Sequence, residues 1–442
     1  MPFALRISGR SQLLSPQSQL QPPLSSFIMA VHSGSSAPPS IPGFLLSAQD
    51  SESLKRDVAQ LLERDNIRFP GAQPVSFARK HLAEIQQREY FLCEKTDGIR
   101  CLLYLTFIDR GHVIEPLTIL IDRKNNYYET EVPLRFPYHA SIQNPEQFLY
   151  GTVLDGELVN DITPDGGRQL IFYIFDCLAV DNTNMTAKTL DKRIGHMQER
   201  CIKPWQKYMK WSQTGPQRNP FVVKEKQFQP AYHLSNLFDN VLPNLKHGND
   251  GLIFTCKSSR YVFGTDQGIL KWKPPHENTI DFRLRLGDFP LFDPEDGEEG
   301  LIPDYDAMPE SFHLLVNHGS RDYRHFANLT VTPEEWTMFK SLEQRLDGRI
   351  IECYRTVEGQ WRFKKEDDGT PRWRDDKTDA NHISTVNSVL ESIEQPVTED
   401  DLRRAESKVK EAVYRLRKEE AAHFQHEQQE HAKKRKIGEV HN

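Results

Sequence analysis

A lysine, a carboxylate and an arginine lie close together in the segment Glu94-Lys95-Thr96-Asp97-Gly98-Ile99-Arg100. A lysine amine that has lost its proton is a nucleophile and can form a covalent intermediate. The alternation over 89–93 and the apolar run 101–107 predict two strands, with Asp97-Gly98 as a tight turn between them. We therefore expect Lys95 and Arg100 near each other at two strand ends. A surface hairpin with solvated charges would contain the same residues, so the rest of the chain must decide.

Further segments place charged side chains beside short apolar runs, namely 154–159, 170–178, 250–254 and 269–274. Lys271 and Lys273 are two residues apart, which predicts that they share one face of a strand. Glu157 and Asp250 each belong to an acid-glycine pattern at the start of a strand, where a carboxylate can orient an amine or bind a metal. A mixed basic and acidic cluster lies far downstream at 372–377.

Length and composition restrict the class of protein. A chain of 442 residues with 37% hydrophobic content predicts two domains with ordinary cores. The net charge of −7 argues against a protein that coats nucleic acid non-specifically, so any phosphate site must be local. No apolar run reaches the length of a membrane span, so no membrane partner is expected. The six cysteines form no C-x-x-C pair, which predicts buried thiols and no structural zinc.

The pattern along the chain predicts five parts. These are a disordered extension rich in Ser, Pro and Gln at 1–45, a first domain at 46–282, a second domain at 283–396, a helix at 397–425 and a basic flexible tail at 426–442. The second domain has the size of a five-stranded barrel and includes an acidic stretch, 288–310, which we interpret as a solvated loop. The helix carries one apolar stripe made by Leu402, Val409, Val413 and Leu416.

In order and content these segments resemble the covalent nucleotidyltransferases, the superfamily of mRNA capping enzymes and polynucleotide ligases. The resemblance runs from about Pro70 to Thr398 and is closest to the fungal mRNA guanylyltransferases, through the segments 121–128, 270–274 and 374–377. It implies an α+β fold. A nucleotidyltransferase domain of antiparallel sheets with flanking helices is followed by a C-terminal OB-fold β-barrel, and the helix 397–425 returns to the first domain. The Gly369-Thr370-Pro371 insertion departs from the family pattern and leaves the geometry at Arg372 open.

The resemblance implies a reaction in two steps. Lys95 attacks the α-phosphate of GTP and releases pyrophosphate, and the lysyl-GMP then passes GMP to the 5′-diphosphate end of nascent pre-mRNA to form a GpppN cap. A lysine with an ordinary pKa near ~10.4 is almost all ammonium at neutral pH, so cations nearby are expected to favour the neutral amine. Mg²⁺ or Mn²⁺ would neutralise phosphate oxygens, with Glu157 and Asp250 near the metal or the lysine.

The family also implies finer roles. Lys271 and Lys273 would hold the α-phosphate, Arg100 and Arg123 would contact ribose or phosphates, and Phe175 and Ile253 would sandwich the guanine. From the second domain Arg374, Asp376 and Lys377 would reach the β- and γ-phosphates when the domains close. Two alternatives stay open from the residues themselves. The aromatic that stacks on guanine could be Phe172, Tyr173 or Phe175, which could equally be core residues, and Asp176 could be a ligand or a strand-end cap.

Expected partners follow from the same resemblance. The chain lacks a His-Cys-x5-Arg phosphatase loop, so a separate RNA 5′-triphosphatase subunit is expected, with the phosphorylated C-terminal tail of RNA polymerase II as recruiting partner. Capping implies the nucleus, and the run Lys433-Lys434-Arg435-Lys436 is of the type that import receptors read. The competing hypotheses are an ATP-dependent RNA or DNA ligase with a lysyl-AMP intermediate, which shares Lys95 and Lys271, and a catalytically silent binding module.

Overall fold

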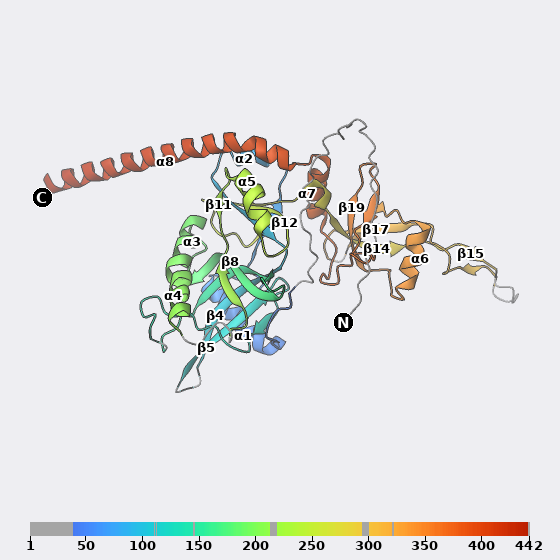
Figure 1. Ribbon diagram of the computed structural model, residues 1–442, viewed down its shortest axis with the longest axis horizontal. Coiled ribbons are helices and arrows are strands. Elements are labelled where there is room, and N and C mark those ends of the chain that lie inside the picture. The colour runs from blue at the N-terminus through green and yellow to red at the C-terminus, as the bar shows by residue number, and fades with distance from the viewer. Residues whose placement is uncertain are drawn as a thin grey trace, which may run out of the picture.

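We describe a computed structural model of the chain, which covers residues 39–440 apart from 110, 112, 145, 213–218, 294–299 and 321. Figure 1 shows two β-rich domains side by side, with a long C-terminal helix lying along the first of them. Most of the predicted extension, residues 1–38, lies outside the described residues. Residues 44 and 45 differ from that prediction, because Phe44–Leu45 forms a short strand that pairs with the edge of a sheet.

The largest sheet of the first domain has the strand order β1-β6-β5-β4-β7-β8-β10, with β9 paired to β8. All of these pairs are antiparallel except β10 with β8. The strands are β1 (Phe44–Leu45), β4 (Ile99–Asp109), β5 (Ile114–Asp122), β6 (Tyr127–Glu129), β7 (Thr152–Ile162), β8 (Arg168–Val180), β9 (Thr183–Asn184) and β10 (Val222–Glu225).

A second sheet of five strands has the order β11-β3-β12-β13-β2. Its strands are β2 (Ala72–Ser76), β3 (Tyr90–Thr96), β11 (Gln229–Pro230), β12 (Asn249–Cys256) and β13 (Gly264–Trp272). The two strands that flank Asp97-Gly98 are thus present, but they do not pair with each other, because β3 belongs to this sheet and β4 to the larger one. The turn carries the chain from one sheet to the other, and so Lys95 and Arg100 lie where the two sheets meet.

Helices pack against these sheets (Figure 1). They are α1 (Ala48–Leu61), α2 (His81–Glu84), α3 (Leu190–Met197), α4 (Lys203–Trp211) and the short α5 (Leu234–Asn236). The apolar faces of α3 and α4 bury Met197 and Trp205 against the larger sheet, where Trp205 stacks on Phe136. All six cysteines are buried and unpaired, as their positions in apolar runs predicted. None of the helices in the described part of the chain is long and apolar enough to span a bilayer.

The second domain is a barrel of five strands in the order β18-β17-β14-β19-β20. Its elements are β14 (Ile280–Leu286), β17 (Phe312–Asn317), β18 (Tyr323–Asn328), α6 (Pro333–Ser341), β19 (Ile350–Arg355) and β20 (Trp361–Phe363). A parallel bridge between Leu329 and Trp361 joins the two outer strands and closes the sheet on itself. The interior is filled by aromatic and aliphatic side chains, among them Phe282 and Trp361. This is the small barrel that the sequence pattern predicted.

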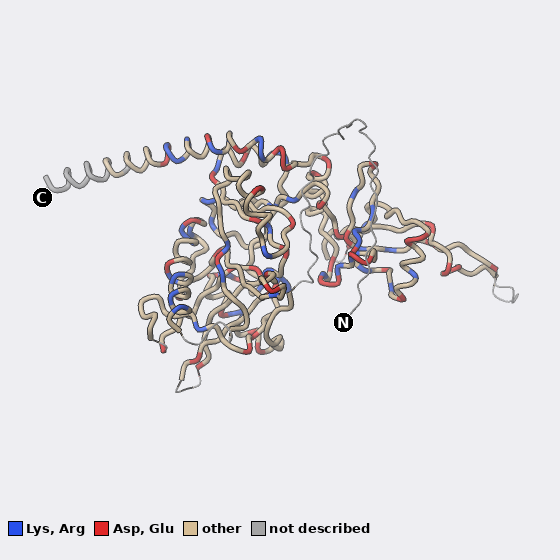
Figure 2. Tube along the Cα trace, viewed as in Figure 1, with Lys and Arg blue, Asp and Glu red and all other residues tan. Residues whose placement is uncertain are grey.

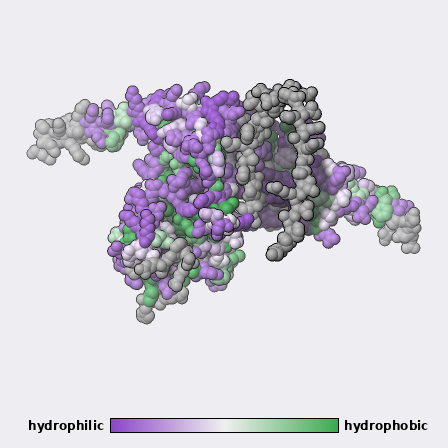
Figure 3. All heavy atoms as spheres, viewed as in Figure 1, coloured by the Kyte–Doolittle hydropathy of each residue, from purple (hydrophilic) through white to green (hydrophobic). Residues whose placement is uncertain are grey.

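The acidic stretch 288–310 is more ordered than the predicted solvated loop. Its described part contains the strands β15 (Leu291–Phe292) and β16 (Ile302–Pro303), which pair and project from the barrel (Figure 1). Apolar side chains stay exposed there, with Leu301 64% and Tyr305 69% accessible. Figure 3 shows the matching hydrophobic surface near this end of the molecule. The dense run of carboxylates in the sequence therefore hid a short pair of strands with apolar side chains.

Two C-terminal helices link the barrel back to the first domain. The first, α7 (Ile383–Glu394), packs on the barrel core through Val386 and Val389 and approaches β2, where the Ser392 hydroxyl donates to the Phe77 carbonyl at 3.5 Å. The second, α8 (Glu399–Val440), follows a turn in which the Trp272 indole donates to the carbonyl of Val397 at 2.7 Å. Leu402, Val409 and Val413 of the predicted stripe are buried in the core of the first domain, while Leu416 is only half-buried.

The helix continues to Val440, and this differs from the flexible tail expected for 426–442. The physical reason is the composition of that stretch, since Glu, Gln, Lys and Ala all favour the helix and no Pro interrupts them. Figure 2 shows Lys, Arg, Asp and Glu interspersed along the first part of α8, where pairs such as Arg403 with Glu399 at 2.6 Å support the helix.

Truncating the buried stripe of α8 is expected to destabilise the first domain. Leu402→Ala should lower the free energy of unfolding by about 2–5 kcal/mol, because loss of a fully buried leucine leaves a cavity between α8 and the five-stranded sheet of the first domain. Chemical denaturation of the full chain measures the change. Lys410→Ala, on the exposed side of the same helix, is the matched control and should stay within about 0.5 kcal/mol of the parent. Equal stability of the two variants would contradict a packing role for α8.

Candidate active site

One face of the five-stranded sheet carries the lysines. Ile253 on β12 lies opposite Lys271 on β13 and opposite Cys93 on β3. Because residues two apart point to the same side of a strand, Lys95 shares the face of Cys93, and Lys273 follows Lys271 at the end of β13. The register thus brings Lys95, Ile253 and Lys271 to one face, with Lys273 directly after β13, as the spacing in the sequence predicted for Lys271 and Lys273.

The larger sheet supplies the opposing groups. Arg100 on β4 lies directly opposite Glu157 on β7, and Glu157 lies opposite Tyr173 on β8. The pairing of β7 with β8 shifts by one residue next to this point, and Phe175 is the residue left out of register. Its ring is half-buried, with the Arg100 guanidinium 5.6 Å from the ring centre. The bulge therefore directs a partly exposed aromatic ring toward the same region.

Asp250 links two of the lysines. Its Oδ1 accepts from the Lys95 Nζ at 2.5 Å, and its Oδ2 lies 2.7 Å from the Lys273 Nζ. Burial alone would raise the pKa of Asp250, but Lys95 and Lys273 bring it down to about 2. The next residue must be glycine, since Gly251 has φ +140° and a Cβ there would meet the Trp272 carbonyl oxygen at 2.0 Å. This close approach fixes Asp250 against the end of β13.

Lys271 is the lysine of this site whose protonated form is disfavoured by its surroundings. Burial, and then the neighbouring cations Lys273 and Lys95, lower its pKa to about 8. Arg123 and Lys377 add smaller contributions in the same direction. Four cations therefore surround Lys271. A polyphosphate bound in their midst would restore full protonation of this amine.

This arrangement predicts a pH-dependent affinity for nucleotide. The folded pKa of Lys271 is lowered, so its positive charge is complete well below pH 8 and is lost as the pH rises through that value. Affinity for the non-reactive α,β-methylene-GTP should therefore fall above pH 8, by up to about tenfold per pH unit. Titration calorimetry between pH 7 and 9.5 measures it. Lys271→Met should bind the nucleotide more weakly at all pH values, and its affinity should not fall above pH 8. If the affinity of Lys271→Met also fell above pH 8, the loss of charge responsible would belong to another group.

The two predicted arginines differ in how they are held. Arg100 donates to both carboxylate oxygens of Asp155, at 3.0 and 2.6 Å, and to the main chain of Ala72. Tyr261 donates to the same carboxylate at 2.5 Å, so Arg100 is fixed from two sides. Among the described residues, Arg123 donates only to the side chain of Gln73, at 3.0 Å. The side chain of Arg100 is therefore held in place by the protein, whereas more of the Arg123 donors are available to a ligand.

Glu157 differs from Asp250 in having no partner. Within the described residues its carboxylate forms no hydrogen bond or ion pair. Burial raises its pKa, against the opposing charges of Lys226 and Lys95. Among the described residues no group of three or more His, Cys, Asp and Glu could hold a metal. A magnesium ion commonly uses one or two carboxylates together with substrate phosphates, and the free Glu157 fits that kind of site.

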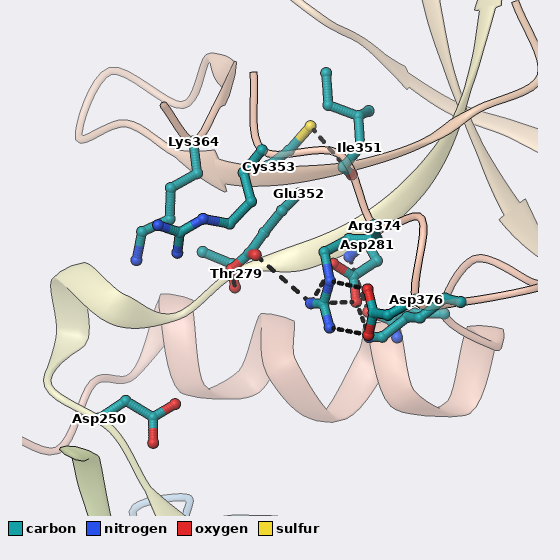
Figure 4. Close-up of polar contacts among 12 residues, drawn as sticks. Asp250, Thr279, Asp281, Ile351, Glu352, Cys353, Lys364, Arg374 and Asp376 are labelled. Atoms are coloured by element: carbon teal, nitrogen blue, oxygen red, sulfur yellow. Dashed lines mark hydrogen bonds and ion pairs between the residues drawn. The ribbon is translucent and has the colours of Figure 1, made fainter. Parts of the chain in front are cut away.

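The downstream cluster lies on the barrel of the second domain. Figure 4 shows Arg374, Glu352 and Lys364 on one side of the barrel strands. The Arg374 guanidinium donates to Asp376 at 3.0 Å and to the buried Asp281 at 3.1 Å, while Lys377 pairs with Asp281 as well. Desolvation by the surrounding protein, then the charge of Arg100 and more weakly that of Arg374, lower the pKa of the Arg123 guanidinium. The cluster of the second domain therefore lies within electrostatic reach of the first.

Sequence reasoning missed a buried network behind Lys95. Lys226, which follows β10, lies 2.9 Å from the Glu94 carboxylate and also donates to the Thr96 hydroxyl. Burial opposes the charge of Lys226, yet Glu94 raises its pKa. His247 lies 2.8 Å from Asp161 and 3.7 Å from Glu94. The residues on either side of Lys95 are thus held by a cation far away in sequence, which no local pattern could reveal.

The open question about Asp176 is answered by the contacts. It is buried, and both of its oxygens accept from the Arg193 guanidinium at 2.7 and 2.8 Å. It therefore joins β8 to α3 and is not exposed to a ligand. Phe172 is likewise part of the apolar core, and the Tyr173 hydroxyl donates to Asp161 at 2.9 Å. Of the three aromatics on β8, Phe175 is the one left available.

Two β-rich domains, the first with Lys271 on a sheet face near Lys95 and the second carrying Arg374 and Lys377, are the arrangement of the covalent nucleotidyltransferases. The chain matches the model for the mRNA capping enzyme catalytic domain over residues 37–275 and that for the mRNA capping enzyme C-terminal domain over 277–403. The chain belongs to the mRNA capping enzyme family, and it is a guanylyltransferase, as the motifs predicted.

Curated relatives agree with this family. The mRNA-capping enzyme subunit alpha of Schizosaccharomyces pombe is 44% identical over 379 residues, 86% of this chain and 90% of the relative. The subunit alpha of Neurospora crassa is 41% identical over 84% of this chain and 92% of its own, and that of Saccharomyces cerevisiae is 36% identical over 84% and 86%. A solved mycobacterial DNA ligase D with ATP and MES is 15% identical, covers 70% of this chain and 94% of its own, and has a TM-score of 0.33, too low to bear on function.

Proposed function

We propose that Lys95 is the nucleophile of this guanylyltransferase and carries GMP from GTP to the 5′-diphosphate end of an RNA. The observation that supports this most directly is the position of the Lys95 amine. It lies 2.5 Å from the Asp250 carboxylate, with Lys271 and Lys273 on the same face of the sheet. A lysine nucleophile needs a fixed position and neighbouring positive charge, and the register of three strands provides both.

The first step forms a bond between the Lys95 nitrogen and the α-phosphorus, while the bond from that phosphorus to the bridging oxygen breaks and pyrophosphate leaves. Asp250 orients the amine, and Lys271 and Lys273 offset the negative charge that develops on the α-phosphate. Arg100 and Arg123 contact the ribose or the phosphates, and Phe175 and Ile253 enclose the guanine from opposite sheets. In the second step an oxygen of the RNA diphosphate displaces the lysine from the phosphorus and completes the triphosphate bridge.

The cluster on the barrel serves the first step. Arg374 and Lys377, oriented by Asp376 and Asp281, contact the β- and γ-phosphates once the two domains close. A divalent cation, Mg²⁺ or Mn²⁺, would be held by the free Glu157 together with phosphate oxygens, and by Asp250 if its lysine contacts loosen. Such an ion supplies charge neutralisation for the departing pyrophosphate.

Nucleotide choice tests this function against the ligase alternative. The protein is incubated with magnesium and either α-labelled GTP or α-labelled ATP, then denatured and separated. Label from GTP that stays on the denatured chain is the expected result. Label from ATP instead would support a ligase, and label from neither nucleotide would support a binding module without catalysis.

The partners and the compartment follow from the activity. The relatives carry the name subunit alpha, and we propose that a separate RNA 5′-triphosphatase subunit removes the γ-phosphate of the RNA before this chain acts. Recruitment by the phosphorylated C-terminal tail of RNA polymerase II and residence in the nucleus complete the proposal. A reporter fused to residues 425–442 tests import through Lys433-Lys434-Arg435-Lys436, and a reporter that stays in the cytoplasm would reject that signal.

A further inference from the structure

A small open cavity lies on the barrel beside the start of the second domain. Its volume is about 270 Å³, and it is lined by His276, Glu277, Tyr354, Phe363, Lys364 and Lys365. The Tyr354 side chain is 37% exposed and His276 is exposed as well, although both carry rings. None of these six residues has a role in the chemistry described above. The cavity therefore combines exposed rings, two lysines and a carboxylate at a place that GMP transfer from GTP does not use.

The cavity adjoins the chemistry on the first domain. His276 and Glu277 follow β13 and the lysine pair by only a few residues. Despite its burial the pKa of Lys273 is raised, first by Asp250 and further by Glu277, so Glu277 lies within reach of the phosphate site. An acceptor strand whose 5′ end reaches Lys95 can therefore extend toward this cavity.

One side of the barrel carries both the cavity and the cluster at Arg374. Residues two apart on a strand share a face, so Tyr354 lies on the side of the barrel where Glu352 meets Arg374 at 3.5 Å. Figure 4 shows Glu352 and Lys364 on this side, with Asp250 of the first domain further along in the same direction. Lys364 pairs with Glu277 and so joins the barrel wall of the cavity to the segment that follows Lys273.

The lining favours a nucleobase over a phosphate. The Glu277 carboxylate would repel a phosphate but can accept from the amino and imino groups of a base, and the tyrosine and histidine rings offer faces for stacking. The positive charge lies at the rim, where Lys365 is half exposed and pairs with Glu335 at 3.0 Å. A phosphate of the RNA backbone can compete with Glu335 for the Lys365 amine. Small β-barrels of this type bind single-stranded nucleic acid through such combinations of rings and cations.

We propose that this cavity binds a base near the 5′ end of the acceptor RNA, with Tyr354 stacking on it and Lys365 contacting the adjacent backbone. The inference rests on the proposed function, because it concerns the RNA that receives GMP. It assigns the barrel a second task beside the contacts of Arg374 and Lys377 with GTP. Stacking does not depend on base identity, so the subsite would hold the RNA in register without selecting a sequence.

Equilibrium binding of a fluorescent 5′-diphosphate RNA oligonucleotide to the full chain tests this subsite. Tyr354→Ala should weaken binding by about fivefold to a hundredfold, the range for loss of one stacked base, whereas Tyr354→Phe should bind as the parent does. Lys365→Ala should reduce the slope of log affinity against log salt by roughly 0.7. Tyr305→Ala removes another exposed tyrosine of the second domain outside the cavity, and it should leave binding unchanged.

An RNA that lacks bases at its first three nucleotides separates stacking from a general disturbance. The parent and Tyr354→Ala should bind this RNA equally, and a penalty that persists on it would overturn the proposal. Equal binding of the normal RNA by parent and Tyr354→Ala would also overturn it. Each variant is assayed for label from GTP as well. If the parent is labelled from GTP and Tyr354→Ala does not change the affinity for RNA, the subsite alone is rejected. If the parent is not labelled from GTP, the proposed function is rejected.

Discussion

Lys95→Arg is expected to reduce formation of the protein–GMP adduct to background, a loss of at least about a thousandfold. An arginine keeps the positive charge and can still pair with Asp250, but it does not lose its proton and cannot attack phosphorus. The substitution therefore separates the charge of residue 95 from its nucleophilicity. Adduct is measured by labelling with α-labelled GTP and denaturing electrophoresis.

Two controls make this result specific. Lys95→Arg should still bind α,β-methylene-GTP, since the phosphate contacts of Lys271 and Lys273 remain. Lys257→Arg changes a lysine of the same domain that pairs with Glu89 at 3.1 Å and takes no part in the contacts of Asp250, and it should label normally. An adduct of ordinary yield in Lys95→Arg would remove Lys95 from the role of nucleophile.

Arg374→Ala is expected to separate the two half-reactions. Its guanidinium is held by Asp281 and Asp376 at the edge of the barrel that faces the first domain. If its target is the β- or γ-phosphate, then adduct formation from GTP should fall by about a hundredfold to a thousandfold, the effect of removing one preorganised donor from a charged leaving group. Transfer of GMP from the lysine to RNA involves no pyrophosphate, so that step should proceed at close to the parent rate.

The measurement uses adduct isolated from each variant before RNA is added. Lys271→Ala is the contrasting variant, because the α-phosphate is present in both half-reactions, and it should slow both of them. Arg324→Ala removes an exposed arginine of the barrel that pairs only with Asp322 in the described residues, and it should affect neither step. Equal loss of both steps in Arg374→Ala would show that the barrel cluster acts on the α-phosphate or on closure itself.

The sequence predicted those parts of the site that short spacing determines. Lys271 and Lys273 share a face because strand geometry has a period of two, and Asp250 reaches the lysines because Gly251 permits a close approach to β13. The barrel and the helix stripe at Leu402 were likewise visible as periodic patterns. These features depend on neighbours along the chain, which a single sequence displays directly.

The parts that sequence reasoning missed depend on contacts between distant segments. The partners of Arg100 include Asp155 on β7 and Tyr261 in the loop between β12 and β13. Asp281 supports Arg374 from 93 residues away. The separation of such partners along the sequence differs from pair to pair, so no sequence pattern predicts them. The turn at Asp97-Gly98 resembled a hairpin for the same reason, because only the pairing of β3 and β4 with other strands shows that it joins two sheets.

Peptide mapping of the guanylylated protein tests the central claim most directly. The chain is labelled with GTP and magnesium, digested under conditions that preserve the phosphoramidate bond, and analysed by mass spectrometry. The account predicts one GMP per chain, on the peptide that contains Lys95, and its removal on addition of 5′-diphosphate RNA with formation of capped product. GMP on Lys271 or Lys273, or an adduct that RNA does not discharge, would contradict it.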